Sequence, residues 1–161
     1  MALVTCKSFR VNGNEPEASP LHKRGLLNPL DQRGYTMEFD KLDKFTRSYL
    51  RTAIWSELNE GQPLDRTRNE NDLSSKLLDW AAADCARFQE LADEFISNEP
   101  DRNCDWEQAG HDFWLTRNGH GSGFWDGDWP MFGDALTELS ERFGECSLYV
   151  GDDDQLYHFD G

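Results

Sequence analysis

Residues 110–129, GHDFWLTRNGHGSGFWDGDW, are the stretch on which the choice of fold class depends. They hold two histidines, three tryptophans and five glycines. Asn118-Gly119 at their centre is a strong signal for a two-residue hairpin loop, because both central residues of a type I′ turn need positive φ. The sequence therefore predicts an antiparallel hairpin over residues 111–126.

Pairing outward from this turn places aromatic rings beside glycines. Directly opposed residues of a hairpin share one face, so the indole of Trp114 is expected to lie across the small Gly121 and Gly123. His111 is then opposite Asp126, and the two are expected to form a charge-assisted hydrogen bond. In this interpretation the glycines have a packing role.

Helices are expected on both sides of this hairpin, because apolar side chains recur there at helical spacing. Asp40 is the expected N-cap of the first helix, and Asn71 or Asp72 that of the second. The expected helices span residues 40–58, about 72–98 and 130–143. Two short strands, Ser147–Val150 and Gln155–Phe159, are expected around the acidic turn that follows the third helix.

The chain is long enough for one domain of the α+β class. We expect about three helices packed on a small antiparallel sheet that contains the 111–126 hairpin and the C-terminal strands. Residues 40–161 are expected to form this single domain. Residues 1–39 are expected to form an N-terminal strand at 1–11 and a long loop, partly disordered, at 12–35.

The net charge of −15 is distributed unevenly along the chain. Residues 1–83 carry equal numbers of acidic and basic side chains, whereas residues 84–161 carry the whole acidic excess and no lysine. The negative electrostatic potential of such a chain repels nucleic acids and anionic membranes and attracts basic partners. Direct binding to nucleic acid or to a membrane is therefore not expected.

Four cysteines lie at positions 6, 85, 104 and 146, too far apart in sequence for a metal knuckle or a redox pair. The N-terminus lacks the apolar core of a signal peptide, and no apolar run reaches the roughly 20 residues of a membrane span. These features predict an intracellular, soluble protein with free thiols and no cofactor.

One stretch of the chain has potential metal ligands. His111, Asp112, His120 and Asp126 are side chains that bind catalytic metals. The predicted hairpin works against convergence, because His111 and His120 lie near its opposite ends, about 20 Å apart by strand rise. A small metal-dependent hydrolase acting on a nucleotide or a signalling molecule is therefore kept as the alternative function.

The segment EQAGHDFWLTRNGHGSGFWD, with YLRTAIWSEL upstream and FGECSLYVGDDDQLYHF downstream, resembles a family of small acidic proteins encoded by bacteriophages and prophages. The resemblance covers residues 40–159. It implies expression in a bacterial host, location in the host cytoplasm and an accessory role that is not structural. It implies no mechanism and no catalytic residues.

The leading functional hypothesis is an inhibitor that binds a basic host protein by imitating the charge of nucleic acid. DNA carries one negative charge per about 1.7 Å of its axis, and the channels that bind it are lined with Lys and Arg. The target is expected to be a nucleic-acid-binding enzyme, such as a defence nuclease inhibited in the anti-restriction or anti-CRISPR manner. No catalytic residue is assigned. The expected partner-binding residues are Asp84, Glu90, Asp93, Glu94, Asp152, Asp153, Asp154 and Trp129.

Overall fold

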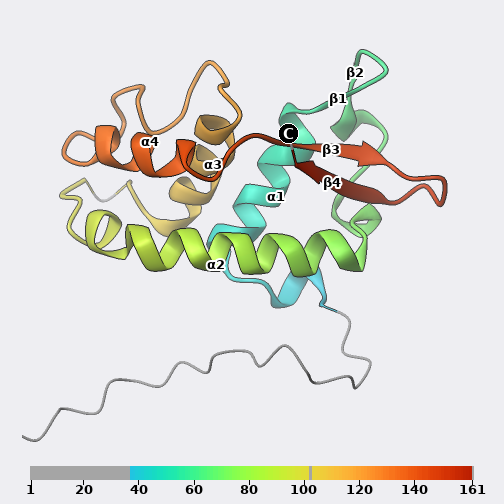
Figure 1. Ribbon diagram of the computed structural model, residues 1–161, viewed down its shortest axis with the longest axis horizontal. Coiled ribbons are helices and arrows are strands. Elements are labelled where there is room, and N and C mark those ends of the chain that lie inside the picture. Colours follow the sequence, from blue (N-terminus) through green and yellow to red (C-terminus); the bar gives the residue numbers. More distant parts are fainter. Residues whose placement is uncertain (1–36, 102, 161) are drawn as a thin grey trace, which may run out of the picture. The chain divides into compact units, whose positions relative to one another are not determined.

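The computed structural model describes residues 37–101 and 103–160 (Figure 1). These residues form four α-helices and two separate two-stranded antiparallel sheets, so the α+β class is confirmed. The strand and loop expected within residues 1–35 lie outside the described residues. The fourth helix arises where a hairpin was expected.

The helices are α1 (Lys44–Ser56), α2 (Ser75–Ser97), α3 (Trp106–Arg117) and α4 (Gly133–Glu141). One sheet pairs β1 (Leu58–Asn59) with β2 (Gln62–Pro63), and the other pairs β3 (Cys146–Val150) with β4 (Leu156–Asp160). Three short 3-10 helices precede α1 and α2: Phe39–Lys41, Leu64–Arg66 and Glu70–Asp72. Helices α1, α2 and α4 and the C-terminal strands match the predicted elements.

The two long helices begin later than predicted, at residues that cap them through their side chains. The carboxylate of Asp43, not that of Asp40, accepts a hydrogen bond from the Thr46 backbone N–H at 3.0 Å and starts α1. The hydroxyl of Ser74 accepts from the Leu77 N–H at 3.2 Å and starts α2. A side-chain acceptor at this position satisfies a backbone donor that has no partner within the helix.

The predicted caps of α2 lie in the last 3-10 helix before it. Asn71 and Asp72 belong to that short helix, and Asn69 caps it by accepting a hydrogen bond from the Asn71 N–H at 2.9 Å. Asp72 accepts in return from the Asn69 N–H at 2.8 Å, which completes a reciprocal capping box.

The predicted 111–126 hairpin is wrong, because residues 106–117 form α3. Asp105 begins this helix by accepting from the N–H groups of Glu107 and Gln108 at 2.9 and 3.0 Å. Asn118 is the C-cap and Gly119 follows with φ of +63°. Helices often end on a glycine with positive φ, so Asn118-Gly119 ends a helix here and does not connect two strands.

The contacts expected from the hairpin are also absent from the described residues. Trp114 is fully buried and donates its indole N–H to the Ser56 hydroxyl at 2.8 Å, so it does not lie across Gly121 and Gly123. His111 bonds to Thr52, not to Asp126. Residues 120–126, which were expected to supply the second strand, form bends and turns.

Helix α3 is central to the fold, and six consecutive residues from Asp112 to Arg117 are buried. Along one side it lies so close to α1 that a Cβ atom at Gly110 would collide with the backbone carbonyl of Phe45. A helix that is buried on most of its surface has no polar face, so its sequence lacks the alternating faces that identify an amphipathic helix.

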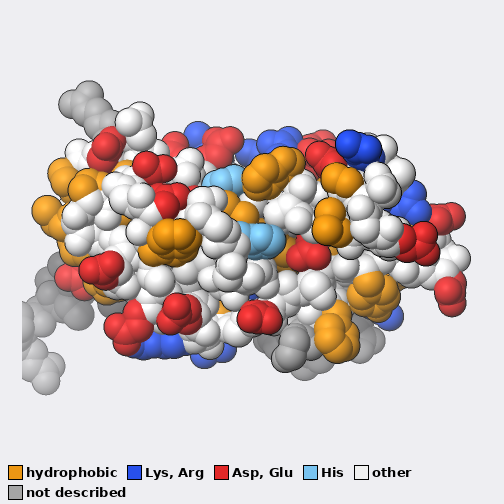
Figure 2. Space-filling model, turned by 90° about the horizontal axis from the view of Figure 1, so that it is seen from above, with side chains coloured by type: hydrophobic (Ala, Val, Ile, Leu, Met, Phe, Trp, Pro, Cys, Tyr) orange, Lys and Arg blue, Asp and Glu red, His pale blue; other side chains and the backbone are white. Residues whose placement is uncertain are grey.

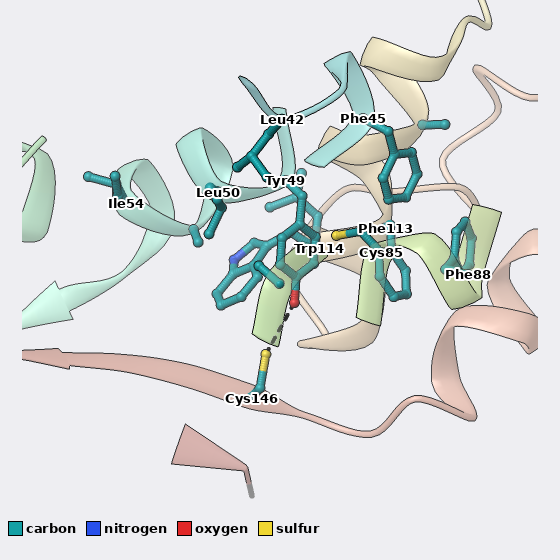
Figure 3. Close-up of a cluster of buried hydrophobic side chains, with 14 of the residues drawn as sticks. Leu42, Phe45, Tyr49, Leu50, Ile54, Cys85, Phe88, Phe113, Trp114 and Cys146 are labelled. Atoms are coloured by element: carbon teal, nitrogen blue, oxygen red, sulfur yellow. Dashed lines mark hydrogen bonds between the residues drawn. The ribbon is translucent and has the colours of Figure 1, made fainter. Parts of the chain in front are cut away.

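The core between α1, α2 and α3 is built from aromatic rings, many of them drawn in Figure 3. Phe88 of α2 stacks on Phe113 of α3 with ring centroids 4.0 Å apart. Tyr49 of α1 meets Trp114 edge to face at 5.0 Å. Aromatic rings cover a large area per residue, which compensates for the modest share of aliphatic residues.

The sheet of β3 and β4 packs beside the first half of α2. The ring of His158 stacks on Trp80 of α2 at 4.1 Å, and the Ser74 N–H donates to the carbonyl of Leu156 at 3.1 Å. Within residues 37–101 and 103–160, no helix has both the length and the apolar character that crossing a membrane requires.

Candidate functional site

The acidic residues predicted on α2 fall into two kinds. Glu90, Asp93 and Glu94 are exposed on its C-terminal half. Asp84 instead forms an ion pair at 2.6 Å with Arg117 of α3, and its side chain is only 21% exposed. Asp84 therefore neutralises an internal positive charge and adds little to the outer surface.

Arg117 connects three parts of the fold from a side chain that is 2% exposed. Its guanidinium donates to the Tyr49 hydroxyl of α1 at 2.9 Å and to the carbonyls of Phe143 and Gly144 at 2.9 and 2.7 Å. Burial raises the pKa of Tyr49, so this phenol stays neutral beside the cation. A buried guanidinium needs such partners for its donors, and the network is structural.

Asp152, Asp153 and Asp154 are exposed in the turn between β3 and β4. Asp153 accepts a hydrogen bond from the Tyr157 hydroxyl at 2.8 Å, which lowers the pKa of Asp153, and Asp154 pairs with Arg68 at 2.9 Å. This turn lies near the N-terminal end of α2, where Lys76 borders the same cleft as Asp152 and Asp153.

The predicted acidic residues consequently do not form one row. Lys76 and Asp93 are separated by 17 positions of α2, about 25 Å at 1.5 Å per residue. The turn carrying Asp152–Asp154 and the half of α2 carrying Glu90–Glu94 therefore lie at opposite ends of this helix (Figure 1). Figure 2 likewise shows carboxylates spread over the visible face.

One long stretch of the chain, residues 88–141, nevertheless has no exposed basic side chain among the described residues, although the exposed Arg87 and Arg142 flank it and Arg142 pairs with Glu138 at 2.6 Å. Between residues 88 and 141 the sequence has two basic residues, of which Arg117 is buried and Arg102 lies outside the described part. We call the exposed carboxylates of this region the acidic end. Its members are Glu90, Asp93, Glu94, Asp101, Asp105, Glu107, Asp126, Asp128, Asp134, Glu138 and Glu141.

Contacts between distant segments hold the acidic end together. The Glu99 carboxylate after α2 accepts from the N–H groups of Met131 and Phe132 at 3.3 and 3.2 Å, just before α4. The Cys104 thiol before α3 donates to the carbonyl of Asp128 at 3.0 Å. The end of α2, the start of α3 and the start of α4 therefore meet here.

The tryptophan expected as an interface anchor is part of the core. Trp129 is 2% exposed, and its indole N–H donates to the buried Asp112 at 2.7 Å. Trp125 and Met131, 52% and 60% exposed, supply apolar surface beside the acidic end in its place. Sequence alone does not distinguish the buried Trp129 from the exposed Trp125, because both stand in the same short stretch of glycines and acidic residues.

The four candidate metal ligands are not brought together. The Asp112 carboxylate accepts from Gln108 as well as Trp129, and burial raises its pKa although both hydrogen bonds act in the opposite direction. Asp126 accepts from the N–H groups of Gly123 and Asp128, each at 3.3 Å. In residues 37–101 and 103–160, no group of three or more His, Cys, Asp or Glu side chains has an arrangement that suits a metal ion.

His111 has a defined bonding role. Its Nδ1 lies 2.8 Å from the Thr52 hydroxyl oxygen, and that hydroxyl donates its single hydrogen to the carbonyl of Ser48 at 2.9 Å. The Thr52 oxygen therefore accepts from His111, and Nδ1 carries a proton. The bond links α3 to α1 in the place where a bond to Asp126 was expected.

The thiols of Cys85 and Cys104 are poorly suited to nucleophilic chemistry. Burial, assisted by the nearby Glu99 and Asp101 carboxylates, raises the pKa of Cys104 to about 11. Burial and the adjacent Asp84 also raise the pKa of Cys85. Since the thiolate is the reactive form, neither cysteine is activated at neutral pH.

Two clefts in the surface are large enough for a small molecule. A cleft of about 670 Å³ lies against the β3–β4 turn and is bordered by Lys76, Tyr149, Tyr157 and two aspartates. A second cleft of about 500 Å³ lies beside Trp55 at the end of α1. The second cleft is not evident from the sequence, because its residues come from segments 55–66 and 115–122, which only the fold brings together.

Comparison of the chain with protein-family models, curated proteins and solved structures finds no match in any of the three.

Proposed function

We propose that this protein is a phage-encoded accessory protein that acts by binding, and that its acidic end docks on a basic surface of a host protein. The observation that carries the proposal is the set of exposed carboxylates with no exposed basic side chain among the described residues between 88 and 141. The partner that fits this charge is a nucleic-acid-binding enzyme of the host cytoplasm, whose groove is lined with Lys and Arg. Occupying that groove inhibits the enzyme.

The proposal depends on charge complementarity, not on a copy of the phosphate spacing. Complementary fields accelerate encounter and orient the partners. Trp125 and Met131 add exposed apolar surface beside the carboxylates, and aromatic anchors supply much of the binding energy in protein interfaces. The resemblance to small acidic phage proteins supports the same class of function.

Two variants with equal loss of charge test this proposal. The first, Glu90→Gln/Asp93→Asn/Glu94→Gln, neutralises part of the acidic end. The second, Asp152→Asn/Asp153→Asn/Asp154→Asn, neutralises the β3–β4 turn at the other end of α2. Each protein, and the parent, is immobilised and exposed to bacterial lysate at low and at raised salt. The nucleic-acid binding of each captured enzyme is then measured with and without the added protein.

We expect the parent and the turn variant to capture the same basic proteins and to inhibit their binding to nucleic acid. The variant of the acidic end should capture less, and raised salt should release what the parent holds, because screening weakens contacts between exposed charges. Capture that is indifferent to salt and to neutralisation of the acidic end contradicts the proposal.

A further inference from the structure

The cleft beside Trp55 combines an exposed aromatic ring with a cation, and we infer that it binds a free nucleoside monophosphate. Its walls come from the end of α1, the segment 63–66 and the end of α3 with the turn that follows. Its volume of about 500 Å³ lies in the range of small-molecule pockets, roughly 300–1,000 Å³. The residues bordering it are Trp55, Ser56, Pro63, Asp65, Arg66, Leu115, His120 and Ser122.

Trp55 supplies the surface on which a base can stack. It is 58% exposed although its neighbours on α1, Ala53 and Ile54, are buried in the core. The ring of His111 lies against it with centroids 6.1 Å apart and an interplanar angle of 34°. Stacking on an aromatic side chain is tolerant of base identity because every base presents a π face.

Arg66 supplies the positive charge for a phosphate group. Among the described residues no carboxylate lies within ion-pairing distance of its guanidinium, and the hydrogen bond it makes is a long one of 3.4 Å to Gln62. The two other arginines near Trp55 are occupied, since Arg51 pairs with Glu70 and Arg68 pairs with Asp154. An arginine available for ion pairing suits phosphate, which it binds through two parallel hydrogen bonds.

Polar groups around these two residues complete the site. The Ser56 hydroxyl accepts from the Trp114 indole N–H at 2.8 Å, so its own hydrogen remains to be donated into the cleft. Asp65 offers an acceptor for the amino or hydroxyl groups of a nucleoside. His120 and Ser122 border the cleft on the side of the turn after α3.

The charge of the site and of the whole chain favours a free monophosphate over a nucleic-acid strand. The cleft has a single arginine, Arg66, beside the carboxylate of Asp65, so it offers one guanidinium for one phosphate group and no row of cations for a strand. A net charge of −15 repels an extended polyanion. No residue of the acidic end borders the cleft, so this inference stands independently of the proposed function.

The test is a titration of the full chain with AMP, GMP, CMP and UMP. Calorimetry measures the affinity, and NMR monitors the indole N–H resonance of Trp55. Adenosine and inorganic phosphate are titrated in parallel, together with a short single-stranded oligonucleotide. The variants are Trp55→Ala and Arg66→Gln. The matched controls are Trp125→Ala and Arg142→Gln, which remove an exposed tryptophan and an exposed arginine outside the cleft.

We expect at least one monophosphate to bind and to shift the Trp55 resonance. Trp55→Ala and Arg66→Gln should each weaken binding by about tenfold or more, which corresponds to about 1.4 kcal/mol, while both controls bind like the parent. Equal melting temperatures of variants and controls show that the loss is local. Adenosine and phosphate should each bind more weakly than the nucleotide.

Several results overturn the inference. Absence of binding by all the monophosphates does so, as does unchanged affinity in Trp55→Ala or Arg66→Gln. If adenosine binds as tightly as the nucleotide, the phosphate group contributes nothing to binding. If inorganic phosphate binds as tightly, the nucleoside contributes nothing. Tighter binding of the oligonucleotide assigns the cleft to a nucleic-acid strand and rejects a free monophosphate.

Discussion

The guanidinium of Arg117 at the end of α3 lies 2.6 Å from the carboxylate of Asp84 on α2. Asp84 was expected to face a partner protein, yet its charge is directed inward to a cation whose side chain is 2% exposed. The same guanidinium donates to Tyr49 and to two carbonyls after α4. One side chain therefore links α1, α2 and α3 to the segment that follows α4.

Asp84→Asn is expected to destabilise the protein by about 3 kcal/mol, because it leaves the buried charge of Arg117 without its counter-charge. Chemical denaturation at neutral pH measures the free energy of unfolding. The control is Asp93→Asn, an exposed site on the same helix, which should stay within about 0.5 kcal/mol of the parent. Equal stability of the two variants would show that the ion pair contributes nothing.

Gly123→Val is expected to cost about 2–4 kcal/mol, from a strained backbone and a clash. Gly123 has φ of +149°, and a Cβ atom there would meet the hydroxyl of Thr116, which accepts from the Phe124 N–H at 3.0 Å. The hairpin interpretation predicts a cost at the same glycine through a clash with Trp114, whereas the structure assigns the clash to Thr116.

Gly121→Ala is the matched control for that experiment, since nothing lies within 4 Å of a Cβ placed at Gly121. Its thermal unfolding should be nearly the same as that of the parent. If Gly123→Val has the same melting temperature as Gly121→Ala, the turn after α3 is not packed as described.

Gly110→Ala reverses the usual effect of this substitution. In a helix interior alanine is normally more stable than glycine by about 1 kcal/mol. Here the added methyl group collides with the Phe45 carbonyl where α3 touches α1, so we expect a loss of about 3 kcal/mol. Denaturant titration measures the change, and a stabilised variant would rule out the close approach of the two helices.

Asp112 should make stability decrease as the pH rises. Burial raises its pKa above the ordinary value of 3.8, so the folded state binds this proton more tightly than the unfolded state. Its contribution to the free energy of unfolding is therefore lost as the pH rises from 3.8 through the raised pKa, and is constant above it.

Asp112→Asn isolates this effect from the repulsion among the other carboxylates. The advantage of the parent over the variant should decline across that pH interval in a series of denaturation curves. NMR titration of the Asp112 carboxyl carbon gives the pKa directly. Parallel stability curves, or a pKa below 3.8, would contradict the assignment.

The elements that the sequence predicts well are those with one buried face. Helices α1, α2 and α4 and the strands β3 and β4 have regular apolar spacing, and they are found within a few residues of the predicted bounds. The caps are less predictable from sequence, because acidic and amide residues stand at several adjacent positions. The structure selects Asp43 and Ser74 by their hydrogen bonds.

Helix α3 was missed because two local signals have more than one structural meaning. Asn118-Gly119 suits a type I′ turn and also the end of a helix, since both need positive φ at glycine. The burial of residues 112–117 removes the polar face that would have marked a helix. Asp105 followed by Gln108 is the signal that was available, as a capping residue and its partner in the first turn.

The candidate site was predicted only in part. Composition indicates an acidic C-terminal half, and the exposed Glu90, Asp93 and Glu94 agree with that. Which carboxylates are used internally depends on tertiary contacts, as the ion pair of Asp84 shows. The cleft beside Trp55 depends on segments 55–66 and 115–122, which meet only in the folded chain.

The network around Arg117 sets an order for folding during protein synthesis. Its carbonyl partners are at residues 143 and 144, and the Asn118 side chain accepts from the N–H of Cys146 at 2.9 Å. All four helices are synthesised before this segment. Until the segment is available, the Arg117 guanidinium at the end of α3 lacks the two carbonyl acceptors that it has in the folded protein. A chain truncated before residue 143 should therefore remain sensitive to protease, whereas the full chain, which also supplies β3 and β4, should be resistant.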